Sequence, residues 1–213
     1  MIALIDYGIS NLRSVQKAFE HLETEVTLVD TPDRLAQADR LILPGVGAFP
    51  AGMKGLQERG LIEPIKQAAR EGKPLIGICL GMQLLFESSD EMGETRGLGL
   101  LPGQVTRIQD ARSKRQDAGR KMQSVLKIPH MGWNQLDVTR DHPLVRDLTS
   151  GSYAYFVHSY AIYPADQNIV LATTDYGGPF ASIVGRGKVC GLQFHPEKSQ
   201  AVGLRLLRNF LEM

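Results

Sequence analysis

The chain has 213 residues, of which 43% are hydrophobic, and a formal net charge of +1 at pH 7. This length and composition suit one globular domain, 1–213, with a full hydrophobic core. The near-zero charge gives no reason to expect nucleic acid or an anionic membrane surface as a partner, and no apolar run reaches the roughly 18 residues that a membrane span needs.

The first half of the chain alternates predicted strands and helices. Met1 leads directly into an apolar strand without a signal-peptide pattern, and two cysteines make no disulfide framework, so we expect a soluble protein of the reducing cytoplasm. Hydrophobic periodicity predicts strands at Ile2–Ile5, Val26–Val29, Leu41–Leu43 and Pro74–Ile78, and helices at Ser10–Leu22 and Leu61–Arg70, the second closed by Gly72. Such alternation indicates right-handed crossovers and a parallel sheet.

The second half has a different rhythm, with short strand-like stretches between Gly, Pro and Asp turns. The predicted strands are Gln104–Ile108, Tyr153–Val157, Ile169–Thr173, Ala181–Val184 and Val189–Phe194, followed by a helix at Gln200–Leu211. We therefore expect an α/β fold: a three-layer open sheet, mainly parallel with antiparallel additions, and helices on both faces. The basic, polar segment Asp110–Gln123 is interpreted as an exposed loop, with a docking role as the alternative.

Cys79 lies at the corner between the apolar strand Pro74–Ile78 and a segment with helical spacing. Gly77 and Gly81 flank it at two residues on either side, as a tight nucleophile elbow requires. The N-terminus of the following helix favours a thiolate, the form of cysteine that attacks. A cysteine in an apolar strand is more often a small buried hydrophobe, and Cys190 receives that interpretation.

A histidine and a carboxylate lie far downstream in His195-Pro196-Glu197. Their spacing of two puts both side chains on one side of an extended segment. Alone, this tripeptide is typical of a surface turn. Together with Cys79, it predicts a Cys-His-Glu triad for acyl transfer.

These motifs carry a family resemblance. Gly77-x-Cys79-x-Gly81-x-Gln83 with His195-Pro196-Glu197 resembles the class I, or triad, glutamine amidotransferases over essentially the whole chain. Three further segments are similar to the glutaminase subunits of imidazole glycerol phosphate synthases: Pro44–Phe49, Pro129–Asn134 and Tyr155–Tyr160.

The resemblance implies hydrolysis of the side-chain amide of L-glutamine, with no cofactor and no metal. Cys79 would attack the amide, His195 would protonate the leaving ammonia and then activate water, and Glu197 would orient His195. The backbone N–H groups implied for the oxyanion hole belong to Val46, Gly47 and Leu80, although a Pro-Gly-x-Gly run alone is more often a simple turn. The residues implied for glutamine binding are Gln83, Glu91, His158, Ser159 and Tyr160. Without the resemblance, His158 would be interpreted as a structural histidine.

The resemblance also implies a heterodimer with a cyclase subunit, a (β/α)8 barrel. That subunit would use the ammonia to convert the ribulosyl nucleotide PRFAR into imidazole glycerol phosphate and AICAR. The implied docking face includes His130, Trp133, Asn134, Tyr155 and Lys198. Trp133 would ordinarily belong to a core, but aromatic anchors are also enriched in interfaces.

Other functions remain as alternatives. The chain could serve another amidotransferase, such as the enzymes of anthranilate or aminodeoxychorismate synthesis or the pyridoxal phosphate glutaminase, but Pro129–Asn134 argues against these. A catalytically silent assembly subunit would have no need for all three triad residues. A cysteine protease of related fold is a weaker option.

Overall fold

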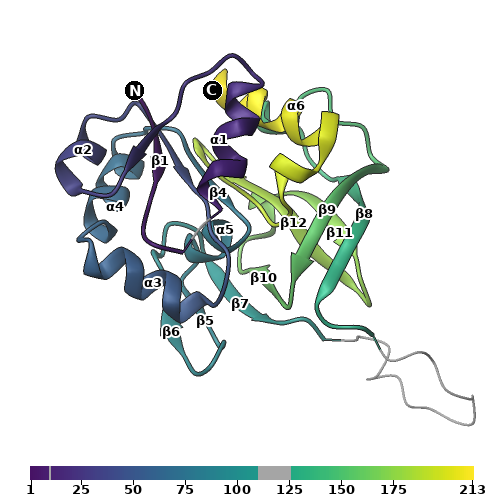
Figure 1. Cartoon of the computed structure of the whole chain (residues 1–213). Helices are drawn as coiled ribbons and strands as arrows, with labels where there is room; N and C mark the ends of the chain where they lie inside the picture. Colours follow the sequence, from purple (N-terminus) through teal and green to yellow (C-terminus); the bar gives the residue numbers. More distant parts are fainter. Residues whose placement is uncertain (10, 110–125) are drawn as a thin grey trace, which may run out of the picture.

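The computed structural model describes residues 1–9, 11–109 and 126–213, which form an α/β structure around a nine-stranded sheet (Figure 1). The first five strands in spatial order are parallel to one another, and each of the remaining pairings is antiparallel. In spatial order the strands are β2 (Thr27–Val29), β1 (Ile2–Ile5), β3 (Arg40–Leu43), β4 (Leu75–Ile78), β13 (Val189–Leu192), β12 (Pro179–Arg186), β11 (Val170–Asp175), β8 (His130–Val138) and β9 (Ser152–His158).

Helices cover both faces of this sheet, because successive strand residues point to opposite sides and both sides are apolar. Ala3, Leu41 and Leu75 pack in one buried cluster, whereas Leu4 and Ile42 pack in another. The first cluster includes side chains of α2 (Pro32–Ala36), α3 (Phe49–Glu58), α4 (Ile62–Arg70) and α5 (Leu80–Leu84). The second includes side chains of α1 (Leu12–Glu20) and α6 (Gln200–Leu211). The expected fold class is therefore confirmed.

A second, four-stranded sheet was not expected from the sequence. Its strand order is β10 (Tyr160–Pro164), β7 (Gly103–Arg107), β5 (Ser88–Ser89) and β6 (Thr95–Arg96). The strand β10 follows β9 with only Ser159 between them, so the chain passes from one sheet directly to the other. Three single-turn 3-10 helices complete the described structure: η1 (Pro143–Val145), η2 (Gln167–Ile169) and η3 (Pro196–Lys198).

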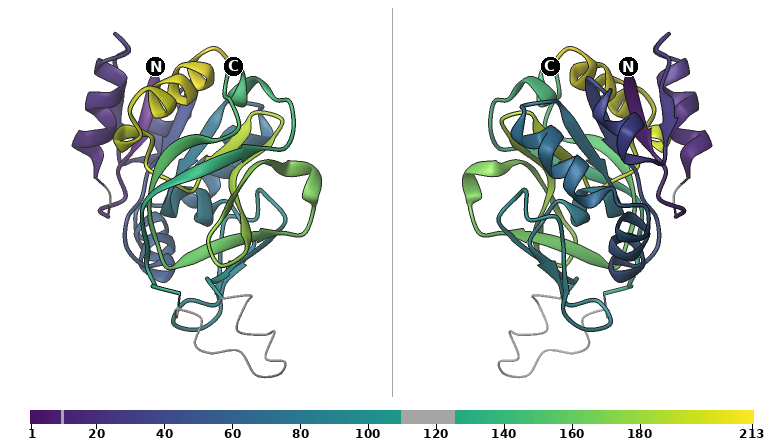
Figure 2. Two further views of the ribbon diagram at one scale, coloured as in Figure 1. Left: turned by 90° about the vertical axis from the view of Figure 1, so that its right-hand side faces the viewer. Right: turned by 90° about the vertical axis from the view of Figure 1, so that its left-hand side faces the viewer.

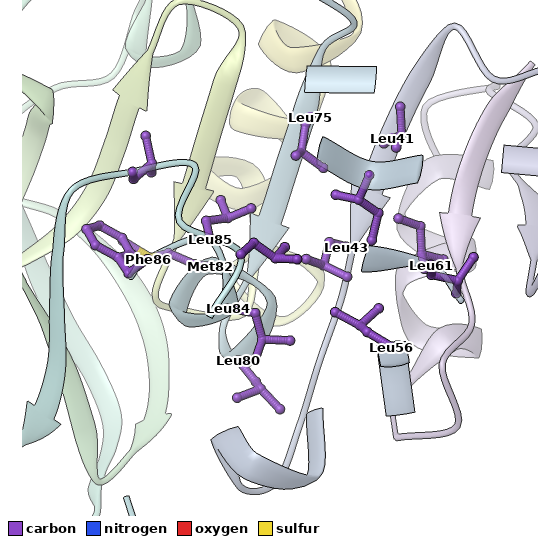
Figure 3. Packing of buried hydrophobic residues seen from close by; sticks show 14 of the residues in the cluster. Leu41, Leu43, Leu56, Leu61, Leu75, Leu80, Met82, Leu84, Leu85 and Phe86 are labelled. Carbon is purple, nitrogen blue, oxygen red and sulfur yellow. The ribbon is translucent and has the colours of Figure 1, made fainter. Parts of the chain in front are cut away.

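The short helix α5 is held in the core by its own side chains. Leu80, Met82 and Leu84 are each at most 1% exposed. Figure 3 shows them in one buried cluster with side chains from the neighbouring strands and helices, among them Leu41, Leu43, Leu56, Leu61 and Leu75. Burying side chains of this size contributes about 1.5–3 kcal/mol each, so the segment that follows Cys79 is firmly positioned.

Most predicted elements are confirmed, with shifted ends. The helix expected at Ser10–Leu22 runs over Leu12–Glu20, and the last helix has the predicted bounds. The segment Asp110–Gln123 lies outside the described residues. Both chain termini lie at the same end of the molecule (Figures 1 and 2). In the described ranges, no helix is long and apolar enough to cross a membrane.

Candidate active site

Cys79 occupies a strained turn between β4 and α5. Its φ of 54° and ψ of −110° place it in a region that costs a non-glycine residue about 1–3 kcal/mol. Its N–H donates to the carbonyl of Leu192 on the adjacent strand β13 at 2.7 Å. A Cβ on Gly77 would lie 2.6 Å from the Gly81 carbonyl oxygen, and one on Gly81 would lie 1.7 Å from the Leu43 carbonyl oxygen. The expected elbow is thus present, and backbone crowding explains both glycines.

His195 and Glu197 form a buried pair beside this turn. His195 Nδ1 and Glu197 Oε1 are 2.8 Å apart, and their side chains are 5% and 2% exposed. Burial alone would lower the pKa of His195, but its interactions with Cys79 and Glu197 raise that pKa to about 10. His195 Nε2 has no well-formed hydrogen bond to any described residue, so it can exchange a proton with a bound molecule.

The two halves of the predicted triad meet because β4 and β13 are parallel neighbours. Ile78 pairs with Leu192, so Cys79 and His195 both follow the carboxyl ends of adjacent strands. Ligand sites in open α/β sheets commonly lie outside these strand ends. The arrangement can perform nucleophilic acyl transfer, with Cys79 as nucleophile and His195 as proton carrier. Among the residues that the structure describes, no group of three or more His, Cys, Asp or Glu side chains could hold a metal ion.

A cavity of about 340 Å³ opens onto Cys79 and His195, which is a common size for a small-molecule site. Every residue predicted for glutamine binding lines it: Gln83, Glu91, His158, Ser159 and Tyr160. The predicted oxyanion residues Val46, Gly47 and Leu80 also line it. Sequence reasoning missed Pro129, Met131 and Val157, which complete the lining. The structure thus brings these residues together, while their roles remain predictions.

Two of the three backbone donors predicted for the oxyanion hole are already engaged. Leu80 N–H donates to the Gly45 carbonyl oxygen at 3.3 Å, and Val46 N–H donates to the Ile9 carbonyl oxygen at 3.3 Å. The Tyr7 hydroxyl donates to the Pro44 carbonyl oxygen at 2.6 Å and so anchors the start of this loop. The Gly45 carbonyl group must therefore turn away before Leu80 N–H can donate to a substrate.

Gln83 and Glu91, which line the cavity, also make hydrogen bonds within the protein. Gln83 Nε2 donates to the Tyr160 carbonyl oxygen at 3.0 Å and to Gln193 Oε1 at 3.1 Å. Glu91 Oε2 accepts from Phe49 N–H at 2.8 Å, at the N-terminus of α3. The second carboxylate oxygen of Glu91 makes no hydrogen bond within the described part of the protein, which leaves it available to a ligand in the cavity. No sequence motif pointed to Gln193.

Three of the five residues expected on a docking face form one surface group. The ring centroids of Trp133 and Tyr155 are 5.9 Å apart, and Lys198 Nζ lies 5.7 Å from the Tyr155 ring. Trp133 is 47% exposed, and Asn134 beside it is half-buried. The expectation for His130 is wrong: it is 3% exposed and stacks on Tyr176, with ring centroids 3.9 Å apart, because its side chain points inward from β8.

Comparison with known proteins places this geometry in context. The family model "Glutamine amidotransferase class-I" matches residues 3–213. The protein "Imidazole glycerol phosphate synthase subunit HisH" from Syntrophotalea carbinolica is 50% identical over 213 residues, covering 100% of both chains. Its namesake from Salinibacter ruber is 51% identical over 210 residues, covering 99% of this chain and 93% of that protein.

Solved structures share the fold at lower identity. A structure described as a glutamine amidotransferase has a TM-score of 0.74 at 23% identity, covering 100% of this chain and 98% of its own. A chain in the structure of PurLQS from Thermotoga maritima has a TM-score of 0.73 at 23% identity, covering 99% of this chain and 97% of its own.

Proposed function

Because the chain belongs to the class-I glutamine amidotransferase family, we propose that it is the glutaminase subunit of an imidazole glycerol phosphate synthase. The whole chain acts as one amidotransferase domain that hydrolyses glutamine to glutamate and ammonia. The ammonia passes to a cyclase subunit, a (β/α)8 barrel, which converts PRFAR to imidazole glycerol phosphate and AICAR. The observation that carries the proposal is the single cavity where Cys79, His195 and the predicted glutamine-binding residues meet.

In the proposed reaction, Cys79 Sγ attacks the side-chain amide carbon of glutamine. His195 delivers a proton to the leaving nitrogen, the C–N bond breaks, and ammonia departs from a thioester. Neutral His195 then takes a proton from water, which attacks the thioester and releases glutamate. Glu197 stabilises the charged imidazole through its 2.8 Å contact with Nδ1.

The loop conformation supports a partner-dependent activity. The Leu80 and Val46 N–H groups are engaged within the protein, and removal of one oxyanion donor costs about a hundredfold to a thousandfold in rate. We therefore expect the isolated chain to be a poor glutaminase. Docking of the cyclase would favour the conformation in which the Gly45 carbonyl releases Leu80 N–H. We place the complex in the cytoplasm, where the free thiol of Cys79 stays reduced.

The proposal is tested with Cys79→Ala and a matched control, Cys190→Ala, each assayed in complex with the cyclase. Cys190 is fully buried, and burial raises its pKa to about 12, so it has no nucleophilic role. We expect Cys79→Ala to lose glutamine-dependent synthesis by several orders of magnitude and to keep synthesis from added ammonia. Cys190→Ala should keep both activities.

Mass spectrometry provides a second readout. A diazo-ketone analogue of glutamine should label Cys79 and leave Cys190 unmodified. Retention of glutamine-dependent synthesis by Cys79→Ala would refute the assignment. Absence of glutaminase activity from the wild-type complex would instead favour a silent assembly subunit.

A further inference from the structure

Two buried histidines, His130 and His158, link strand β8 to the turn between β9 and β10. His130 Nδ1 lies 3.0 Å from His158 Nε2, and His158 Nδ1 lies 2.8 Å from the Tyr160 carbonyl oxygen. On the other side, Asn134 Nδ2 lies 3.2 Å from His130 Nε2 and 2.9 Å from the Asp175 carbonyl oxygen. These contacts form one continuous chain of hydrogen bonds.

The last acceptor, the Tyr160 carbonyl oxygen, determines which atom donates in every hydrogen bond of this series. A carbonyl oxygen only accepts, so His158 Nδ1 must carry the proton that it donates to Tyr160. His158 Nε2 is then the acceptor, which requires a proton on His130 Nδ1. His130 Nε2 accepts in turn from Asn134, whose second amide hydrogen goes to Asp175. Both rings are therefore neutral and protonated at Nδ1.

The surroundings of the two rings keep them neutral. Burial lowers the pKa of His158 to about 3 and that of His130 to about 4. The His130 ring stacks between Tyr176 and Phe156, with centroid distances of 3.9 Å and 4.8 Å. The packing holds the His130 ring in the plane that its hydrogen bonds need.

This chain of hydrogen bonds ends at the candidate active site. The Tyr160 carbonyl oxygen that accepts from His158 also accepts from Gln83, one helical turn after Cys79. His158, Tyr160 and Gln83 all line the cavity. At its outer end, Asn134 directly follows Trp133 of the surface group on β8. A displacement of β8 would therefore shift the cavity wall, because the hydrogen bonds from Asn134 through His130 and His158 connect β8 to Tyr160.

We propose that His130 is a positioning residue: it holds His158 in the Nδ1-protonated form and thereby fixes the Val157–Tyr160 wall of the cavity. The expected effect of His130 on glutamine kinetics rests on the proposed glutaminase function. The protonation pattern of the two histidines does not depend on that function. His130 touches no substrate in this assignment. It acts through His158 and Tyr160.

The protonation pattern is tested by NMR on the full chain labelled with ¹⁵N-histidine. The chain contains five histidines, so single substitutions suffice to assign them. We expect the imidazole nitrogen signals of His130 and His158 to identify Nδ1 as the protonated atom in both rings at neutral pH. A signal of His130 protonated at Nε2, the commoner form, would overturn the proposal.

The positioning role is tested with three substitutions at His130, measured in complex with the cyclase. His130→Phe keeps an aromatic ring for stacking and removes both hydrogen bonds. His130→Asn places an amide N–H near the position of Nδ1, whereas His130→Gln places its amide near Nε2. We expect His130→Phe and His130→Gln to raise KM for glutamine about tenfold with a smaller change in kcat, and His130→Asn to restore much of the loss.

Synthesis from added ammonia serves as the control, because it bypasses the cavity and should be unchanged in all three variants. An unchanged KM in His130→Phe would refute the positioning role. Equal damage in the Asn and Phe variants would refute it as well, since an N–H restored near the Nδ1 position would then recover nothing. Damage in His130→Asn without damage in His130→Phe would indicate a packing role only. A wild-type complex without glutaminase activity would refute the proposed function, and the NMR result would then decide the inference alone.

Discussion

At the scale of single residues, the site depends on backbone crowding as much as on reactive side chains. Cys79 adopts its strained φ because its N–H bonds to Leu192 and because α5 is fixed in the core. The motif Gly77-x-Cys79-x-Gly81 predicted this turn correctly, since only glycines fit where neighbouring carbonyl groups approach so closely. The pairing of His130 with His158 could not be predicted, because it depends on the long-range register between β8 and β9.

Because His130 and His158 are buried as neutral rings, we expect the protein to lose stability in acid. The folded-state pKa values of His158, about 3, and of His130, about 4, lie below the value of about 6.5 for an unfolded chain. The unfolded state therefore binds more protons in this window. The stability contributed by the neutral rings is present above about pH 6.5 and is lost as the pH falls toward 4, by up to about 1.4 kcal/mol per pH unit for each ring.

Urea unfolding at several pH values between about 7 and 4.5 measures this slope. His130→Asn should reduce the slope by up to about 1.4 kcal/mol per pH unit. The matched control is His21→Gln, because His21 is exposed, and it should leave the slope unchanged. A slope in His130→Asn equal to that of the wild type would contradict the prediction.

At the scale of elements, the apolar strands and long helices were predictable, and the short or polar elements were not. The helix α2 has five residues and one buried side chain, which is too little for a periodic signal. The helix α3 contains Gly52 and Gly55, which are poor helix formers; a Cβ on Gly55 would lie 2.4 Å from the Tyr7 carbonyl oxygen. Close packing therefore outweighed local propensity in α3.

The strand β8 was missed for a related reason. Its nine residues bury only His130 and Leu136 fully, so the sequence lacks a clean alternation of apolar and polar residues. The second sheet was missed because β5 and β6 have two residues each. By contrast, most of the cavity residues named from the resemblance lie in contiguous motifs, such as Gln83 in the motif of Cys79 and His158 within Tyr155–Tyr160, whereas Glu91 lies in none of them.

Glu91 connects two elements, and its substitution should separate a structural role from a binding role. Glu91→Gln keeps an acceptor for Phe49 N–H and loses the negative charge at the N-terminus of α3, at a cost of at most about 1 kcal/mol. If Glu91 also binds the ammonium group of glutamine, KM should rise about tenfold or more with little change in kcat.

The control for this substitution is Glu94→Gln, an exposed residue on the same hairpin, which should change neither quantity. Steady-state glutaminase kinetics with the cyclase present, combined with thermal melting, provide both readouts. A lower melting temperature with an unchanged KM would mean that Glu91 only caps the helix.

At the scale of the whole molecule, the surface group formed by Trp133, Tyr155 and Lys198 lies next to the site. Lys198 follows Glu197 in η3, and the Tyr155 carbonyl accepts from His195 N–H at 3.0 Å. The proposed docking face and the proposed triad therefore share backbone contacts. A partner bound at this face has a short structural route to His195.

Titration of the cyclase into the chain tests this arrangement. Trp133→Ala and Lys198→Ala should each weaken the stimulation of glutamate production by the cyclase about tenfold or more, since tryptophan anchors often dominate such interfaces and Lys198 lies directly beside Glu197. Lys188→Ala is the control, because Lys188 is exposed in the turn between β12 and β13, away from Trp133. Full activity of the wild-type chain without cyclase, unchanged by its addition, would contradict the prediction.

The position of β13 has a consequence for how the protein acquires activity during synthesis. β13 is the last strand in sequence, yet it lies between β4 and β12 at the centre of the large sheet. A growing chain thus exposes its cysteine long before the histidine exists, and pairings between such distant segments form slowly. Incomplete chains, or chains that a protease has trimmed before β13, contain Cys79 but lack His195. Under the proposed mechanism such chains cannot hydrolyse glutamine, so the strand order restricts ammonia release to chains whose large sheet is complete.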